Sequence, residues 1–307
     1  MPQFSRSSGI SAADRRYDYA RGAAGDGDHA AAADLCEQAL EIAPGWAPAW
    51  YALGDARASL GDVEAAQAAF LRALACDPED SQGAGLRLAR LRGESPARPP
   101  DAYVRGLFDQ YAARFEEHLV RDLAYCGPPI LKAAMARACA LAGRDMRFGA
   151  ALDLGCGTGL MALELAGAYA SIDGIDLAPA MAARARASGR YRHVEAGDMQ
   201  AFVAARATAS VDLVLAADVF VYCGDLAPVF AETRRVLASG GLFVFTLQRA
   251  ETGDFVLGDD LRYAQSQAYI ERLAAHEGFH ILGCDTVSVR QDRGVPVPGL
   301  AFVLAAP

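Results

Sequence analysis

The chain has 307 residues, of which 53% are hydrophobic and 22% charged, and its formal net charge is −9. This length predicts about two domains, and the net acidity argues against binding to nucleic acid or to an anionic membrane surface. Lys132 is the only lysine among 29 basic residues, and it follows a leucine, which excludes a Walker-type phosphate loop.

The seven cysteines have irregular spacings and include no CxxC pair. They predict neither a disulfide framework nor a zinc site, and no histidine pair has suitably placed acidic neighbours, so we expect no metal. The first 20 residues lack an apolar core, and no run of 18 apolar residues occurs. We therefore expect a soluble protein in a reducing cytoplasm.

Residues 13–80 contain an internal repeat with a period of 34 residues. Gly27-Asp28 recurs as Gly61-Asp62, and Pro44 recurs as Pro78. Small residues let two antiparallel helices approach closely, while Trp50, Leu53 and Phe70 fill the space between them. This pattern resembles the tetratricopeptide repeat, and residues 81–92 predict a capping helix. We assign residues 1–93 to a small all-α repeat domain.

A segment rich in proline and polar residues, 94–101, predicts a linker, which places a second domain at 102–307. Apolar residues recur at helical spacing between 102 and 125. Gly127-Pro128-Pro129 interrupts that pattern before another alanine-rich helix. Residues 102–147 therefore predict an N-terminal helical segment, and 148–307 the core of the second domain.

From residue 148 onward, short apolar runs alternate with helical patterns. The sequence predicts strands at 150–154, 171–176, 192–195, 211–216 and 241–247. It predicts helices near 159–168, 178–187, 199–205 and 225–238. Such alternation is typical of a parallel, doubly wound α/β sheet. The last two runs, 280–290 and 299–305, have no helix between them and predict an antiparallel hairpin that closes the sheet.

The first predicted strand ends in Asp153 and leads into the turn Gly155-Cys156-Gly157-Thr158-Gly159. Glycines are needed where a backbone turns sharply and a ligand approaches main-chain N–H groups. Asp176 ends the second strand, where an acid can accept from ribose hydroxyls, and Asp198 follows the third. Parallel strands bind ligands at their carboxyl ends, so the three acids surround one crevice.

These motifs resemble class I S-adenosylmethionine-dependent methyltransferases over about residues 103–307. That resemblance implies a Rossmann-like, seven-stranded fold with S-adenosyl-L-methionine as cofactor. The cofactor-binding positions that match the family are Asp153, Gly155, Cys156, Gly157, Gly159, Asp176, Leu177, Asp198, Met199 and Ala217. The whole chain resembles a narrower bacterial group with an N-terminal repeat segment, which usually has histidine where Gln265 stands.

In the resembling family a helix before the first strand covers the cofactor, so Tyr103, Arg105 and Tyr111 are further cofactor-binding candidates. Methyl transfer from a sulfonium depends mostly on positioning the acceptor, and a general base is needed only for a weakly acidic acceptor. The catalytic candidates are Tyr222, which follows the fourth strand, and His118.

Several alternatives remain open. A nicotinamide-dependent oxidoreductase has the spacing GxGxxG, whereas these glycines follow GxGxG. A non-catalytic scaffold that binds the cofactor is a second alternative. For an enzyme, we expect a small-molecule acceptor and O-methylation, with a protein acceptor recruited through the repeats as the other possibility. The repeats could equally serve a protein partner or a homodimer, and we expect no nucleic acid and no membrane as partners.

Overall fold

The computed structural model describes residues 7–110, 112, 124–292 and 294–307. The chain divides into two compact units, Met1–Gln110 and Tyr111–Pro307, each with its own hydrophobic core. The division lies beyond the linker predicted at 94–101, because the helix that follows the linker packs with the first unit. The boundary predicted from composition therefore stays a prediction.

The first unit is all-helical, as the repeat pattern predicts. Its helices are α1 (Ser11–Gly25), α2 (His29–Ile42), α3 (Ala47–Ser59), α4 (Val63–Cys76), α5 (Ala84–Leu91) and α6 (Asp101–Asp109). The period of 34 residues is visible in the helix caps. Asp28 begins α2 by accepting a hydrogen bond from the N–H of Ala31 at 3.0 Å, and Asp62 begins α4 by accepting from Ala65 at 3.1 Å. Such caps satisfy N–H groups that the helix itself leaves unpaired.

Close helix packing explains the small residues of the repeat. A Cβ at Gly54 would lie 2.6 Å from the ring of Phe70, so only glycine lets α3 and α4 approach to this distance. Phe70 is completely buried and Leu53 nearly so. The indole N–H of Trp50 donates to the carbonyl of Pro44 at 2.8 Å. These contacts confirm the tetratricopeptide-like packing, and α5 packs against α4, while its role as a capping helix stays a prediction.

The second unit is built on a seven-stranded sheet with the order β3-β2-β1-β4-β5-β11-β8. Its strands are β1 (Phe148–Leu154), β2 (Tyr169–Asp176), β3 (His193–Ala196), β4 (Val211–Ala216), β5 (Leu237–Gln248), β8 (His280–Val287) and β11 (Gly299–Ala305). β1 to β5 are parallel, and β11 pairs antiparallel with both β5 and β8. The predicted α/β sheet and its closing hairpin are confirmed.

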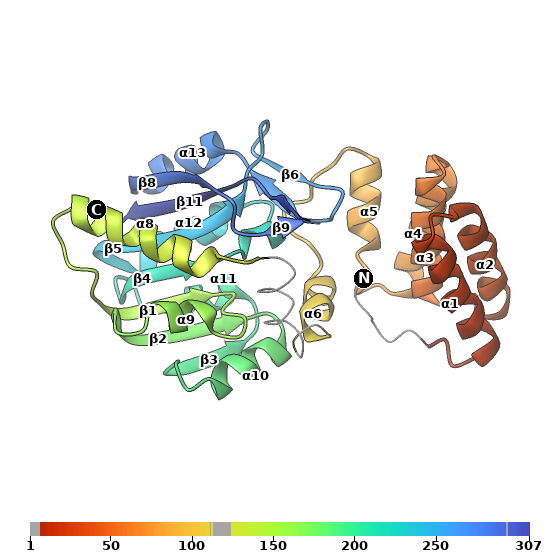
Figure 1. The fold of residues 1–307 in the computed structure, drawn as a ribbon, viewed down its shortest axis with the longest axis horizontal. Helices are drawn as coiled ribbons and strands as arrows, with labels where there is room; N and C mark the ends of the chain where they lie inside the picture. The colour runs from red at the N-terminus through yellow and green to blue at the C-terminus, as the bar shows by residue number, and fades with distance from the viewer. Residues whose placement is uncertain (1–6, 111, 113–123, 293) are drawn as a thin grey trace. The chain divides into compact units, whose positions relative to one another are not determined.

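Helices cover both faces of this sheet (Figure 1). One face carries α8 (Gly127–Leu141), α9 (Leu160–Glu164) and α10 (Pro179–Ala187). The other carries α11 (Met199–Ala204), α12 (Ala227–Val236) and α13 (Gln267–Glu277). The second face includes a cluster of completely buried aromatic rings, Phe220, Phe230, Phe243, Phe245 and Phe302. Burial on both sides explains why β1, β4 and β5 read as nearly continuous apolar runs.

Two short strand pairs, one 3₁₀ turn and the helix α13 lie outside the sequence-based expectations. A small antiparallel pair, β6 (Phe255–Leu257) and β7 (Tyr263–Gln265), precedes α13, and the 3₁₀ turn η2 (Phe220–Tyr222) follows β4. A second short pair, β9 (Gln291–Asp292) and β10 (Val295–Pro296), lies in the loop between β8 and β11. Their short strands carry too little periodicity to be recognised.

Candidate functional site

The site is built where the strand order reverses direction. β1 lies between β2 and β4, so the connection from β1 to β2 and the connection from β4 to β5 leave in opposite directions. In open α/β sheets, ligands bind in the crevice at the carboxyl ends of the strands at such a point. The turns after β1 and β4 touch there. A Cβ on Gly155 would lie 2.4 Å from Cγ2 of Val219, so only glycine lets these turns approach so closely.

In the turn after β1, the N–H of Cys156 donates to the carbonyl of Ile175 and the N–H of Gly159 to the carbonyl of Cys156, each at 2.9 Å. Gly155, Gly157 and Gly159 have φ values of +65°, +54° and +95°, which side chains rarely adopt. Asp176 accepts from the N–H of Gly157 at 2.9 Å and from the N–H of Ala178 at 2.9 Å. The carboxylate predicted to bind ribose thus also holds the glycine turn in place.

Asp153 is 1% exposed and accepts a hydrogen bond from the phenol of Tyr191 at 2.6 Å. Burial raises the pKa of this carboxyl to about 7, while the Tyr191 hydrogen bond opposes the shift and the charge of Asp176 adds to it. Gly174, paired with Asp153 in the neighbouring strand, makes room for this contact, since a Cβ there would lie 3.0 Å from the Tyr191 ring.

The remaining predicted cofactor positions lie at or just after the carboxyl ends of β1, β2, β3 and β4. Leu177, Met199 and Ala217 are half-buried at the ends of β2, β3 and β4, and Asp198 begins α11 by accepting from the N–H of Ala201 at 2.9 Å. Cys156 differs in the direction of its side chain. It is 5% exposed and packs with Ala182, Ala185 and Val194, so only its backbone belongs to the turn.

Asp218, at the end of β4, has a left-handed backbone with φ of +58°. Its N–H donates to the hydroxyl of Thr246 at 2.8 Å, and its carboxylate forms an ion pair with Arg290. Arg290 is 3% exposed and also donates to the side-chain oxygen of Gln248 at 2.9 Å. Burial raises the pKa of Asp218, and the arginine opposes that shift. This network holds the end of β4 in an uncommon conformation.

Tyr222 lies in η2, directly after this segment, and its phenol oxygen accepts a hydrogen bond from Arg262. The loop that carries Tyr222 is held by Gln265, which is completely buried. The Gln265 amide donates to the carbonyls of Phe220 at 3.0 Å and Cys223 at 2.5 Å. Gln265 thus has a structural contact at the position where the resembling group has histidine.

Four of the predicted site residues precede β1 in the sequence. Tyr103 is buried in the first unit, where it packs on Gly83 at a distance that leaves no room for a Cβ. Arg105 is exposed on α6. Tyr111 and His118 lie outside the described residues. A role for Tyr103, Arg105, Tyr111 or His118 stays a prediction.

Sequence reasoning missed four residues that the fold brings to the site: Tyr125, Tyr191, Arg262 and Arg290. Tyr125 lies near Asp153, Asp218 and Arg290, whose charges act on its phenol, and burial raises its pKa. Tyr191 and Arg290 had no motif to reveal them. Arg262 lies three residues before Gln265, where the resembling group usually has histidine, and that neighbourhood is the one sequence signal that points toward it.

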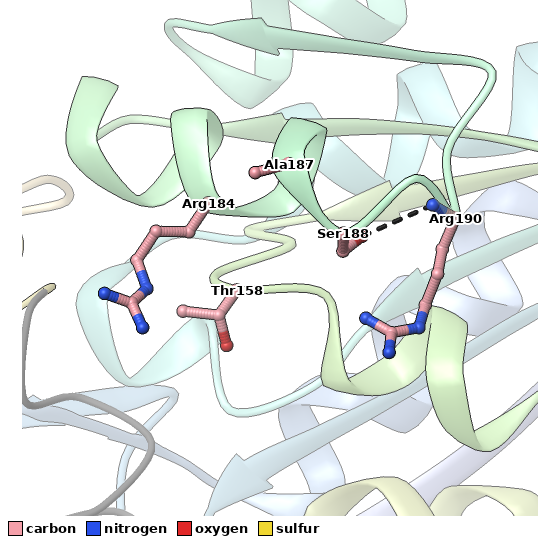
Figure 2. A pocket seen from close by; sticks show the side chains of 5 residues that line it. All are labelled: Thr158, Arg184, Ala187, Ser188 and Arg190. Carbon is pink, nitrogen blue, oxygen red and sulfur yellow. Dashed lines mark hydrogen bonds between the residues drawn. The ribbon is translucent and has the colours of Figure 1, made fainter.

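A shallow pocket of about 310 Å³ lies beside the glycine turn, which contributes Thr158 to its lining (Figure 2). It is lined by Thr158, Arg184, Ala187, Ser188 and Arg190. Arg184 lies in the last turn of α10, where a cation stabilises the helix end. Within the described residues, no group of three His, Cys, Asp or Glu side chains could hold a metal ion.

Comparisons with known proteins agree with this arrangement. A family described as "Methyltransferase domain" matches residues 152–245, and one described as "Tetratricopeptide repeat" matches residues 23–91. A chain from a solved complex of the Haloferax volcanii Trm112 methyltransferase activator with a putative methyltransferase has the same fold. It is 20% identical, with a TM-score of 0.51, over 65% of this chain and 97% of that one.

Two curated relatives are named malonyl-[acyl-carrier protein] O-methyltransferase. The one from Geobacter sulfurreducens is 43% identical over 101 residues, which is 31% of this chain. The one from Legionella pneumophila is 39% identical over 106 residues, which is 33% of this chain. In each case the match spans 37% of the relative's length.

The chain therefore carries a class I S-adenosylmethionine-dependent methyltransferase domain, preceded by a tetratricopeptide-repeat segment. The residues at the crevice suit this cofactor. The carboxylates of Asp153, Asp176 and Asp198 complement a ligand with a positive sulfonium and hydrogen-bond donors on ribose and adenine. None of the helices in the described part of the chain is long and apolar enough to cross a membrane.

Proposed function

We propose that the protein transfers the methyl group of S-adenosyl-L-methionine to an oxygen of a small molecule. The observation that carries this proposal is the glycine turn joined to Asp176 by the Gly157 N–H, with Asp153 buried beneath it. When bound, the cofactor supplies a methyl group on a sulfonium, which is already a good leaving group. The chain's own residues then have to orient the acceptor and exclude water.

The preference for oxygen is supported by the curated relatives, whose names describe O-methyltransferases. They match only a third of this chain. We therefore take from them only that the acceptor atom is an oxygen, and not the identity of their substrate. Tyr222 is the residue best placed to orient the acceptor, because η2 follows β4 directly.

Thermal unfolding of the full chain with S-adenosylhomocysteine, compared with a nicotinamide dinucleotide, tests the cofactor. We expect a rise in the melting temperature with the first ligand alone. A shift with the dinucleotide and none with S-adenosylhomocysteine would overturn the proposal. A shift without methyl transfer to any acceptor would favour the non-catalytic scaffold.

Tyr222→Phe tests the acceptor side. If the phenol orients the acceptor, kcat falls by about ten-fold, the effect of losing a hydrogen bond worth about 1.5 kcal/mol. Affinity for S-adenosylhomocysteine should not change. Kinetics identical to those of the unmodified protein would remove Tyr222 from the site.

The alternative is a protein acceptor recruited through the repeats, whose concave faces commonly bind peptides. Deleting residues 1–93 separates the possibilities. A truncated protein that binds cofactor and methylates small molecules supports the small-molecule proposal. One that binds cofactor and has lost activity supports recruitment or gating by the repeats, and a change from dimer to monomer assigns them to assembly.

A further inference from the structure

Positive charge gathers in one short segment of this protein, whose net charge is −9. Residues 177–194 contain no acidic residue and four exposed arginines: Arg184, Arg186, Arg190 and Arg192. Two of the four are engaged. Arg192 forms an ion pair with Asp173 at 2.6 Å, and the guanidinium of Arg186 donates to the carbonyl of Val194 at 3.0 Å. The other two, Arg184 and Arg190, line the pocket beside the glycine turn.

The two arginines of the pocket have their donor groups available. Across the part of the chain that the structure describes, neither the Arg184 nor the Arg190 guanidinium forms a hydrogen bond or an ion pair. The only other polar side chains that line the pocket are hydroxyls, those of Thr158 and Ser188. In Figure 2 the Thr158 side chain lies between the two guanidinium groups. The lining therefore offers two cations and no anion.

Acidic side chains on the neighbouring segments are all engaged outside the pocket. Their partners are Tyr191 for Asp153, Lys132 for Glu164, Arg192 for Asp173, Arg206 for Glu195, the N–H groups of Gly157 and Ala178 for Asp176, and the N–H of Ala201 for Asp198. The three without a cationic partner in this set are the acids at the cofactor crevice. The remaining acids are each paired with a cation, so none of them offsets the pocket arginines.

The end of α10 supplies some negative charge of its own. Its last carbonyls act as about half a unit of negative charge, which basic residues in the last turn offset. Arg184 and Arg186 lie in that turn, whereas Arg190 lies beyond it. Tyr169, whose phenol lies near enough to Arg190 for their charges to interact, donates to the carbonyl of Ala162 at 2.9 Å. The helix end therefore accounts for one guanidinium and not for both.

Thr158 adds an unpartnered hydroxyl to this lining. The residue is 4% exposed, and its buried hydroxyl has no hydrogen-bond partner within the described residues. A polar group that has lost water without gaining a partner is uncommon in proteins, and an acceptor bound in the pocket would remove that cost. The Ser188 hydroxyl, by contrast, already donates to the carbonyl of Ala185 at 2.6 Å and accepts from the N–H of Arg190 at 3.3 Å.

We propose that Arg184, Arg190 and Thr158 form a binding site for the phosphate group of a small molecule. The site is separate from the proposed methyl transfer. A phosphate monoester carries a charge of about −1.5 to −2 near neutral pH and has three strong acceptor oxygens, which match two guanidinium groups and a hydroxyl. A carboxylate has one charge and two oxygens, so it would leave part of this set unpaired. The net acidity of the protein disfavours the phosphate backbone of a nucleic acid.

Calorimetry of the full chain tests the ligand class. The probes are inorganic phosphate, glycerol 3-phosphate, glycerol, acetate and polyaspartate, at an ionic strength of about 0.15 M, where screening removes weak attraction between distant charges. We expect one site for the two phosphates, weaker binding of acetate and no binding of glycerol. The tighter of the two phosphates shows whether the ligand is a free ion or an ester.

Three outcomes of this titration would overturn the proposal. They are no binding of either phosphate, acetate that binds as tightly as phosphate, and polyaspartate that binds where the phosphates do not. The last result would assign the arginines to an acidic polypeptide surface instead.

Arg184→Gln and Arg190→Gln should each weaken phosphate binding roughly 10- to 100-fold, as expected for losing a charged hydrogen bond. Arg186→Gln is the matched control, because it removes the same charge from the same helix at a residue that does not line the pocket. It should leave phosphate affinity nearly unchanged. Equal losses in the three variants would mean that the local charge attracts phosphate without a defined site.

Thr158→Val tests the hydroxyl, since valine keeps the branched shape and removes the polar atom. We expect weaker phosphate binding, together with a melting temperature that is unchanged or higher without phosphate, because an unpartnered buried group has been removed. Melting temperatures of the arginine variants check that each is folded. A Thr158→Val protein with the phosphate affinity of the unmodified chain would contradict the three-residue site.

Discussion

At the scale of single residues, Asp153 is the group whose chemistry the fold changes most. Its pKa of about 7, raised mainly by burial, lies far above the ordinary aspartate value of 3.8. Without cofactor, the carboxyl is therefore largely protonated below neutral pH. A cationic ligand in the crevice favours its charged form, so cofactor binding should strengthen as pH rises toward and through 7.

The raised pKa also predicts how folding stability depends on pH. Between about pH 4 and 7, Asp153 holds its proton in the folded state and loses it in the unfolded state. The free energy of unfolding therefore falls as pH rises through this window, and this contribution is complete at about pH 8. Asp153→Asn removes it. Urea unfolding at pH 5, 6, 7 and 8 should show a flatter dependence in the variant.

Asp80 in the first unit also has a raised pKa, of about 6. It contributes equally to the unmodified protein and to the Asp153→Asn variant. Only the difference between their free energies of unfolding, plotted against pH, therefore reports Asp153. Parallel curves would contradict the assignment.

Gly155 is the residue where the turns after β1 and β4 meet. Gly155→Ala should destabilise the second unit by about 2–4 kcal/mol, because it combines a left-handed backbone with an overlap against Val219. It should also weaken binding of S-adenosylhomocysteine. The double variant Gly155→Ala, Val219→Ala relieves only the overlap and should recover part of the stability, measured by urea unfolding. Val219→Ala alone is the control, and no recovery would show that the backbone dominates.

At the scale of elements, the contact between β7 and η2 decides the shape of the acceptor side. Gln265 holds two carbonyls of the η2 loop, so Gln265→Ala leaves both without a side-chain donor. We expect a loss of about 1–3 kcal/mol in the free energy of unfolding. Gln265→His restores a ring N–H donor and should lose less. Equal losses would mean that packing volume, and not the hydrogen bonds, is what Gln265 supplies.

At the scale of the whole molecule, the two units have separate cores and should unfold as separate cooperative units. Differential calorimetry of the full chain should show two transitions. S-adenosylhomocysteine at 100 times its dissociation constant should stabilise one of them by about 2.7 kcal/mol and leave the other unchanged. The unmoved transition is the internal control. A single transition that shifts as a whole would mean that the units unfold together.

The regular parts of both units could be predicted because they depend on local patterns. The 34-residue period is repeated in the caps formed by Asp28 and Asp62, and the apolar runs of β1, β4 and β5 are strands that are largely buried. The pairs β6–β7 and β9–β10 could not be predicted, since strands of two or three residues leave no period. Asp198 and Asp176 were found because acids at strand ends meet at one edge of a parallel sheet.

By itself, the sequence determined the two kinds of fold, the glycine turn and the acids at the ends of β1, β2 and β3, because each is encoded within one or two adjacent elements. Only the tertiary structure decided what surrounds them. Tyr191 reaches Asp153 across Gly174, and Arg290 reaches Asp218 from 72 residues away. Arg262 donates to Tyr222 from the turn between β6 and β7, a strand pair that no sequence periodicity predicts. Such contacts depend on how distant segments pack, and burial then sets the charges that the crevice presents.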